Sequence, residues 1–511
     1  LNRYPIGGAV LIFVGASWLQ TNSGAIRFYR QGAGEFDTDR AMGYLTTLTA
    51  PEYEGRAIGS DGISRMADYL GGEFEALGLQ SAGQFNTYYQ ERSRNFSGLE
   101  REPVLEIADG GPPLIYKEDF APYPGRNITD GVAEAPVRVV LLGPEGQRTF
   151  SGFRSSYAGL EDDDFSNEIV LVFSDLAAWY LTRYPKAGML VVTEDESLLN
   201  KRFTLSSRSG LGLNPFTSER TGNEIPSLWI SEDTADRMLR GSGYDLDTLH
   251  KISEDLNTQE VFSTSLEPIV RMDVDSYVEE RFEVRNVIGY IPGSHSRDFC
   301  FDCLASQLIV VMAQYDAPPI GLEGVYEAAN DNASAVAVML ETIRLLQESE
   351  YTPYKTILFV AYSGEGLDGG EVVSDPDVKR FLQAKVGFAS NLNLEAVIKI
   401  RGLGGGSGNK LEVSAAGSLR LAELLERSAG QMGVGSTRAN EPIDISVIYD
   451  DDSSAQQGGQ DAPIVRVVWD GWYENARTAQ DTLENISREA IEEAGNTLTL
   501  ALMIMGREID Y

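Results

Sequence analysis

The chain has 511 residues, of which 42% are hydrophobic and 52 are glycine. This length and composition exclude a disordered chain and indicate a globular α/β protein with two or three domains and a sizeable core. The formal net charge of −35 argues against nucleic acid as a partner, because a phosphate-binding surface needs clustered lysine and arginine.

The N-terminal stretch 5–19, PIGGAVLIFVGASWL, is apolar and carries no charged side chain. It is shorter than the roughly 20 residues that span a bilayer, so a signal-peptide core and a buried soluble helix are alternatives. We expect residues 1–22 to contain an N-terminal apolar helix that anchors the chain in a membrane. This predicts an extracytoplasmic position, periplasmic or lumenal, for the rest of the protein.

Two helices are predicted between residues 37 and 83, because apolar side chains recur at helical spacing over 42–48 and again over 66–77. A glycine-rich turn that contains Glu54-Gly55-Arg56 separates them. From 127 to 270 the pattern changes to short β-rich runs followed by a helix. The predicted strands are 137–142, 168–173, 188–193 and 225–230, and the predicted helix is 232–239.

After residue 284, apolar strands alternate with helices of more than ten residues. The predicted strands are 287–291, 308–312, 356–361, a run ending near Leu394 and 464–468, and the predicted helices are 334–346, 418–431 and 487–505. This alternation predicts a mostly parallel, mixed sheet sandwiched by helices. Asp331 or Asn332 is placed to cap the helix that begins at Ser334. The run Gly402–Gly408, GLGGGSG, indicates a flexible loop.

The segment 308–365 holds an apolar strand, the loop Ala-Asn-Asp-Asn-Ala-Ser at 329–334, a long helix and a second apolar strand. This layout resembles the zinc-dependent aminopeptidase family that includes bacterial leucyl aminopeptidases and glutamate carboxypeptidase. Nicastrin and nicalin are its non-catalytic relatives. The resemblance implies a peptidase-like domain in two parts, 37–126 and 271–511, with a protease-associated-like insert over 127–270.

The resemblance also implies where metal ligands would stand, at the carboxyl ends of strands. Gln314 occupies the place of a ligand histidine, and Asp316 the place of the carboxylate that orients this histidine. Asp331 matches the carboxylate that bridges two zinc ions in the active family. Glu365 keeps the position of the general base.

Three further ligand positions fall on residues that cannot serve. Gly366 has no side chain, Asn393 stands where an aspartate is expected, and Arg477 replaces the histidine of a His-Thr-x-x-Asp-Thr motif. With Gln314, four of five metal-ligand positions are therefore substituted. A lone carboxylate at Asp331 cannot hold zinc tightly, so we expect a vestigial site with neither metal nor cofactor.

Without metal ions, the carboxylates of Asp316, Asp331 and Glu365 would repel one another at close range. One hypothesis is that the guanidinium of Arg477 replaces the metal charge by pairing with Asp331 or Glu365. The alternative is that Arg477 points to solvent.

Cysteine and histidine are scarce. Cys300 and Cys303 form either a local disulfide or two free thiols, because two cysteines alone cannot supply a structural zinc site. The two histidines, His250 and His295, lie outside every ligand motif.

These patterns together predict a pseudo-peptidase: a membrane-anchored accessory or scaffold subunit whose partners are other membrane-protein subunits. Nicastrin and nicalin suggest this role by analogy only. One alternative is a zinc aminopeptidase with a degenerate metal site. The other is a peptide-binding module that captures amino termini through Asp331 and Glu365.

Overall fold

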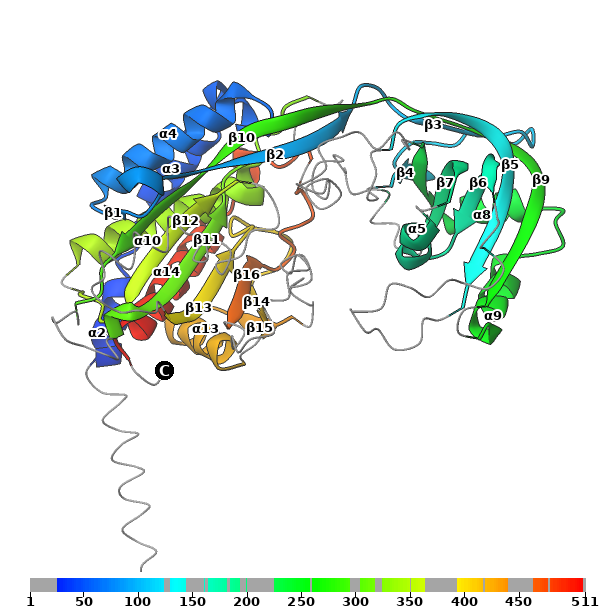
Figure 1. Cartoon of the computed structure of the whole chain (residues 1–511). Helices are drawn as coiled ribbons and strands as arrows, with labels where there is room; N and C mark the ends of the chain where they lie inside the picture. The colour runs from blue at the N-terminus through cyan, green and yellow to red at the C-terminus, as the bar shows by residue number, and fades with distance from the viewer. Residues whose placement is uncertain are drawn as a thin grey trace, which may run out of the picture. The chain divides into compact units, whose positions relative to one another are not determined.

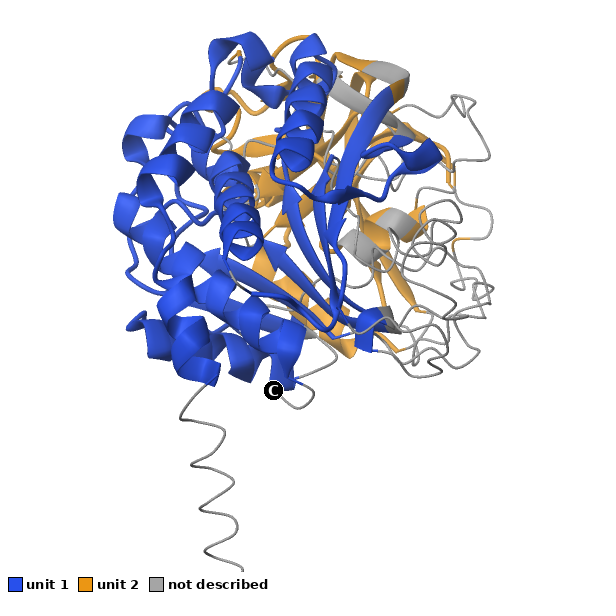
Figure 2. Ribbon diagram, turned by 90° about the vertical axis from the view of Figure 1, so that its left-hand side faces the viewer, with its two compact units in different colours: residues 1–92, 283–317, 325–511 blue, residues 93–282, 318–324 orange. Residues whose placement is uncertain are grey.

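The computed structural model describes residues 25–123, 129–143, 160, 164–181, 184–193, 199, 225–257, 260–294, 304–317, 324–349, 351–363, 393–416, 419–439, 463–476 and 478–508. The chain forms two compact units, which Figure 2 colours separately. Unit 1 comprises residues 1–92, 283–317 and 325–511, and unit 2 comprises residues 93–282 and 318–324. Unit 2 therefore covers a longer span than the 127–270 insert expected from the sequence.

Unit 1 is built on a mixed sheet that has nine strands among the described residues, in the order β1-β10-β12-β11-β13-β16-β14-β15, with β2 also paired to β10 (Figure 1). The strands are β1 (Gln80–Ser81), β2 (Tyr89–Leu99), β10 (Ser276–Ile291), β11 (Gln307–Gln314), β12 (Thr356–Tyr362), β13 (Asn393–Ile400), β14 (Leu411–Ala416), β15 (Ser436–Arg438) and β16 (Ile464–Trp469). The central strands β12, β11, β13 and β16 are parallel, and β10 and β14 flank them in antiparallel pairing. The predicted mixed α/β sheet is thus confirmed.

The central strand β11 is buried along its length, from Leu308 to Ala313. Its nearly continuous apolar run suits a parallel strand covered on both faces, where alternation of polar and apolar side chains would leave polar groups in the core. The following helix, α10 (Ser334–Glu348), is also buried over most of its surface, which explains its apolar sequence SAVAVML.

The helices of unit 1 are α2 (Ala25–Ala33), α3 (Thr38–Leu48), α4 (Asp61–Ala76), α10, α13 (Leu419–Met432) and α14 (Arg488–Arg507). Helix α14 packs against α10, α13, α3 and α2. Side-chain caps fix two helix starts: Asp37 accepts a hydrogen bond from the Arg40 amide, and Ser487 accepts one from the Ala490 amide. The predicted helices in 37–83, 334–346, 418–431 and 487–505 are confirmed.

Unit 2 contains a second sheet, in the order β3-β9-β5-β6-β7-β8-β4. Its elements are β3 (Val104–Ile107), β4 (Phe120–Pro122), β5 (Gly131–Leu142), β6 (Phe165–Val172), α5 (Asp175–Leu181), β7 (Lys186–Thr193), β8 (Ser227–Ser231), α8 (Glu232–Leu239), α9 (Leu246–Asp255) and β9 (Val261–Val274). All four strands predicted in this region and the helix at 232–239 are present. His250 lies on α9, where its ring packs edge to face against Phe173 at 5.8 Å between centroids.

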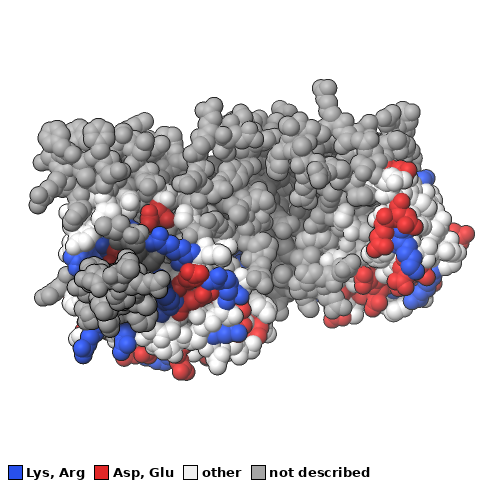
Figure 3. Space-filling view, turned by 90° about the horizontal axis from the view of Figure 1, so that it is seen from below, with Lys and Arg blue, Asp and Glu red and all other residues white. Residues whose placement is uncertain are grey.

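Several expectations fall on residues that the structure does not describe. The N-terminal apolar helix predicted over 1–22 lies outside the described residues, as do His295, Cys300 and Cys303. In the described ranges, no helix has both the length and the apolar content that crossing a bilayer requires. On the described surface in Figure 3, Lys and Arg side chains lie among Asp and Glu side chains.

One strand was misplaced at the sequence level. The run ending near Leu394 was expected to be a strand, but β13 begins at Asn393 and continues to Ile400. It pairs in parallel with β11, so that Gln307 is opposite Asn393 and Ala313 is opposite Ile400. Because the predicted strand ended too early, the sequence did not show that Arg401 is the residue that follows it.

A fully buried arginine joins the start of unit 1 to the central sheet. Arg56 is 0% exposed, and its guanidinium donates to four backbone carbonyls. These are the carbonyls of Leu48 (2.7 Å), Tyr315 (2.8 Å), Glu327 (3.0 Å) and Ala328 (2.7 Å). Arg56 therefore ties together the end of α3, the segment after β11 and the segment before α10.

Burial lowers the pKa of Arg56 to about 10, and nearby carboxylates, led by Asp481, oppose the fall. The side chain stays charged at neutral pH. The turn that carries it needs left-handed backbone at Glu54, Gly55 and Arg56, with φ of 49°, 63° and 58°. A Cβ on Gly55 would lie 2.2 Å from the Tyr326 carbonyl oxygen, so glycine is required there.

We predict that Arg56→Met lowers the free energy of unfolding by about 3 kcal/mol or more, because four buried carbonyls lose their donor while the apolar stem still packs. Urea denaturation measures this change. Arg65→Met is the matched control: the Arg65 side chain is 47% exposed and also donates to a backbone carbonyl, that of Glu52. Its change should stay below about 1 kcal/mol. Equal effects of the two substitutions would contradict the role given to Arg56.

Candidate functional site

The parallel register of three strands brings their carboxyl ends to one edge of the sheet. Gln314 is opposite Tyr362 at the end of β12, and Ala313 is opposite Ile400 at the end of β13. The residues that emerge at this edge are therefore Gln314, Ser363 and Arg401. In open α/β sheets this edge is where functional side chains gather.

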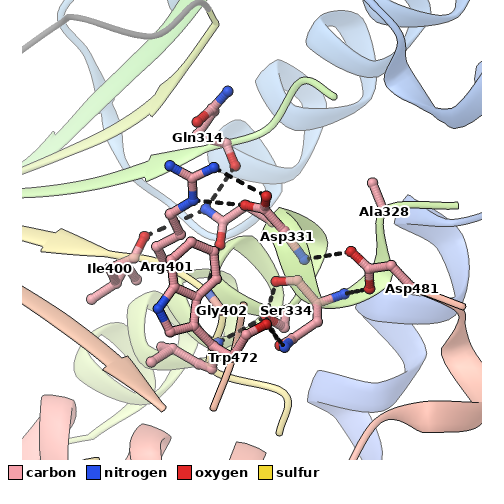
Figure 4. A network of polar contacts seen from close by, with 12 residues as sticks. Gln314, Ala328, Asp331, Ser334, Ile400, Arg401, Gly402, Trp472 and Asp481 are labelled. Atoms are coloured by element: carbon pink, nitrogen blue, oxygen red, sulfur yellow. Dashed lines mark hydrogen bonds and ion pairs between the residues drawn. The ribbon is translucent and has the colours of Figure 1, made fainter. Parts of the chain in front are cut away.

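The loop 329–333 crosses this edge just before α10, and all five residues of the loop are buried. Asn332 joins the ends of two strands: its side-chain amide donates to the Gln314 carbonyl at 3.0 Å, and its side-chain oxygen accepts from the Gly402 amide at 2.9 Å (Figure 4). Asn330 accepts from the Gly404 amide at 2.7 Å. The loop is thus held by bonds to backbone groups of the sheet edge.

The prediction that Asp331 or Asn332 caps the N-terminus of α10 is wrong. The residue before α10 is Ala333, and no side chain caps the helix there. Asn332 is already used between the strands, and Asp331 forms an ion pair. Asp481, from the distant segment before α14, instead accepts the amides of Asn330 (2.6 Å) and Asp331 (3.0 Å).

Asp331 is held by the guanidinium of Arg401. Nε of Arg401 lies 2.7 Å from one carboxylate oxygen, and Nη2 lies 3.0 Å from the other. Asp331 is 5% exposed, whereas the Arg401 side chain is 25% exposed. Figure 4 shows the pairing of Arg401 with Asp331, with Gln314 on one side of the guanidinium and the Trp472 ring on the other. Both oxygens that would face a metal are therefore engaged by an internal cation.

Trp472 supports the arginine from its other side, with the guanidinium carbon 4.8 Å from the ring centroid. Such a stacked cation gains additional attraction from the ring. Gly402 permits this arrangement, because it has φ of +56° and a Cβ there would come within 2.7 Å of Trp472. The glycine run 402–408 was interpreted as a flexible loop, but residues 402–405 are buried and hydrogen-bonded to the loop 329–333.

Two more carboxylates lie deeper at this edge. Asp316 is 1% exposed and accepts a hydrogen bond from the Ser363 hydroxyl at 3.1 Å. Burial raises the pKa of Asp481 to about 6, and the charge of Asp331 adds to that rise, while its two backbone donors and Arg56 oppose it. Three acidic side chains thus share a poorly solvated region.

The structure gathers some of the predicted site residues and not others. Gln314, Asp316 and Asp331 lie together at the carboxyl edge. Asn393 lies at the start of β13, opposite Gln307, and so belongs to the other edge of the sheet. Glu365, Gly366 and Arg477 lie outside the described residues, and the pairing predicted for Arg477 stays a prediction.

Sequence reasoning missed Arg401, Trp472 and the roles of Arg56 and Asp481. Arg401 directly follows β13, so a correct end for that strand would have placed it beside Gln314. No local signal joins Trp472 to Arg401, since 71 positions of chain separate them.

The described residues at this edge do not fit a zinc ion. Zinc needs nitrogen, thiolate or free carboxylate ligands, and Gln314 offers only a neutral amide oxygen. Asp331 would have to release Arg401 first, and the guanidinium would then remain as a positive charge next to the metal. In the part of the chain that the structure describes, no group of three or more His, Cys, Asp or Glu side chains could hold a metal ion.

Comparisons with known proteins agree with this fold. Residues 286–502 match the profile of Peptidase family M28. A search of curated protein sequences found no match.

Among solved structures, the aminopeptidase from Aneurinibacillus sp. strain AM-1 is similar with a TM-score of 0.58 and 15% identity, over 94% of this chain and 96% of that one. The Peptidase M28 precursor from Shewanella amazonensis gives a TM-score of 0.51 and 14% identity, over 95% and 96%. A zinc aminopeptidase from Bacillus subtilis gives 0.47 and 16%, over 93% and 97%. The family match and the two structures with TM-scores of 0.58 and 0.51 show that the chain has a peptidase-like fold, and identities this low show the fold alone.

Proposed function

We propose that this protein is a non-catalytic member of the aminopeptidase fold. The observation that carries the proposal is the two-point ion pair between Arg401 and Asp331. A metallopeptidase needs free carboxylates at this edge to bind the ions that activate water. Here the buried carboxylate is paired at two points with a guanidinium that belongs to the chain.

Gln314 supports the same proposal. It is the last residue of β11, at the place where the resemblance to the active family calls for a histidine. A neutral amide cannot replace an imidazole as a zinc ligand of comparable strength. The protein would then keep the architecture of a peptidase cleft without its chemistry.

The role we propose for such a protein is that of an accessory or scaffold subunit of a membrane complex, anchored through the apolar residues 5–19 on the extracytoplasmic side. The acidic net charge of −35 suits protein partners better than nucleic acid. A role in capturing peptide amino termini through Asp331 is less well supported, because Arg401 already neutralises that carboxylate.

Zinc content and peptidase activity of the purified chain test the loss of catalysis. We expect no stoichiometric zinc after dialysis against micromolar zinc, and no hydrolysis of aminoacyl anilides above that of Asp331→Asn. The variant is the matched control because it removes the carboxylate that the active family uses to bridge its metals. One or two zinc ions per chain that are lost in Asp331→Asn, together with hydrolysis, would show a degenerate but working peptidase.

Purification of the intact chain in mild detergent tests the accessory role. We expect the chain in the membrane fraction, with one or more membrane proteins co-purifying in constant ratio. A variant lacking residues 5–19 is the control and should be recovered in the soluble fraction. An intact chain that is released by carbonate washing and elutes without partners would contradict the proposed role.

A further inference from the structure

We infer that Arg401 is a built-in replacement for the metal charge: its guanidinium neutralises Asp331 and so keeps the loop 329–333 in place without an ion. This inference rests on the proposed loss of catalysis and adds to it a structural role for one residue. It makes Arg401 a determinant of stability at the carboxyl edge of the sheet.

The position of Arg401 is the first support. Arg401 is the first residue after β13. Strand β11 runs parallel to β13, with Ala313 opposite Ile400, and ends at Gln314. A side chain at this place reaches the same edge as Asp331, where ligands would converge on a metal. The positive charge of Arg401 is therefore placed at this edge by strand β13.

The geometry of the pair is the second support. The forked guanidinium contacts both oxygens of Asp331 at 2.7 and 3.0 Å, which is the strongest arrangement available to an arginine and a carboxylate. Trp472 lies against the guanidinium and limits the directions in which it can move. Gly402, whose lack of a side chain admits Trp472, completes the support.

The surrounding charge is the third support. Among the described residues, the acidic groups Asp316, Asp331 and Asp481 are each no more than 5% exposed. Arg56 lies near all three, but it is fully buried and donates to four backbone carbonyls, so its position is already fixed. Removing Arg401 would take away the guanidinium that contacts both oxygens of Asp331.

Burial decides how much this pair contributes. A solvent-exposed ion pair contributes little, whereas removing one partner of a buried pair leaves an uncompensated charge that strongly destabilises the fold. Asp331 is in the second class. Arg438 and Glu426 provide a comparison within the same unit, since they pair at two points, 2.9 and 2.8 Å, but their side chains are 33% and 27% exposed.

A double-mutant cycle in zinc-free buffer with chelator tests the inference. Arg401→Ala should lower Tm by about 5 °C or more, because Asp331 loses its cation. Adding Asp331→Asn to Arg401→Ala should recover at least half of that loss, because the buried carboxylate that has lost Arg401 is replaced by a neutral amide. The control cycle, Arg438→Ala with Glu426→Gln, should show shifts of about 2 °C or less and little coupling.

The outcomes separate clearly. A loss for Arg401→Ala no larger than that for Arg438→Ala, or a double variant whose loss is the sum of the two single losses, overturns the inference. If Arg401→Ala does not fold, the double variant decides: a folded double variant supports the inference and an unfolded one overturns it.

A failed cycle in zinc-free buffer leaves the proposed loss of catalysis standing. Stoichiometric zinc on the wild-type chain would overturn both.

Discussion

The ion pair between Arg401 and Asp331 is the interaction on which this site depends. A charged carboxylate that is only 5% exposed is strongly destabilising without a cationic partner. In this chain the guanidinium of Arg401, the residue after β13, pairs with Asp331. The pair therefore explains how the buried carboxylate of the loop 329–333 is neutralised at the carboxyl edge of the sheet.

The rest of the edge is held by bonds that do not involve this charge. Asn332 joins the ends of β11 and β13, and Asp481 accepts two amides of the loop. Arg56 fixes the segment before the loop through four carbonyls. Hydrogen bonds to backbone groups therefore hold the loop 329–333 at the ends of β11 and β13 independently of the Asp331 carboxylate.

Much of this arrangement could be predicted from the sequence. The apolar runs predicted β11, β12 and four strands of unit 2 (β5, β6, β7 and β8), but not β3, β4 or β9. The position of Asp331 before a long helix identified the edge where it lies. The end of β13 could not be predicted, because Lys399 interrupts the apolar run that would mark a buried strand. Arg401 was missed for that reason, and Asn393 was placed at the wrong edge. Contacts such as that of Trp472 with Arg401 depend on the folded chain and have no local signal.

The central claim is that the guanidinium of Arg401 neutralises Asp331 in the way that a bound metal ion would. Crystals grown in the presence of zinc, with diffraction data collected above and below the zinc absorption edge, test it most directly. We expect no anomalous peak within bonding distance of Asp331 and continuous density joining its carboxylate to Arg401. A zinc peak on Asp331, with Arg401 turned toward solvent, would contradict the account.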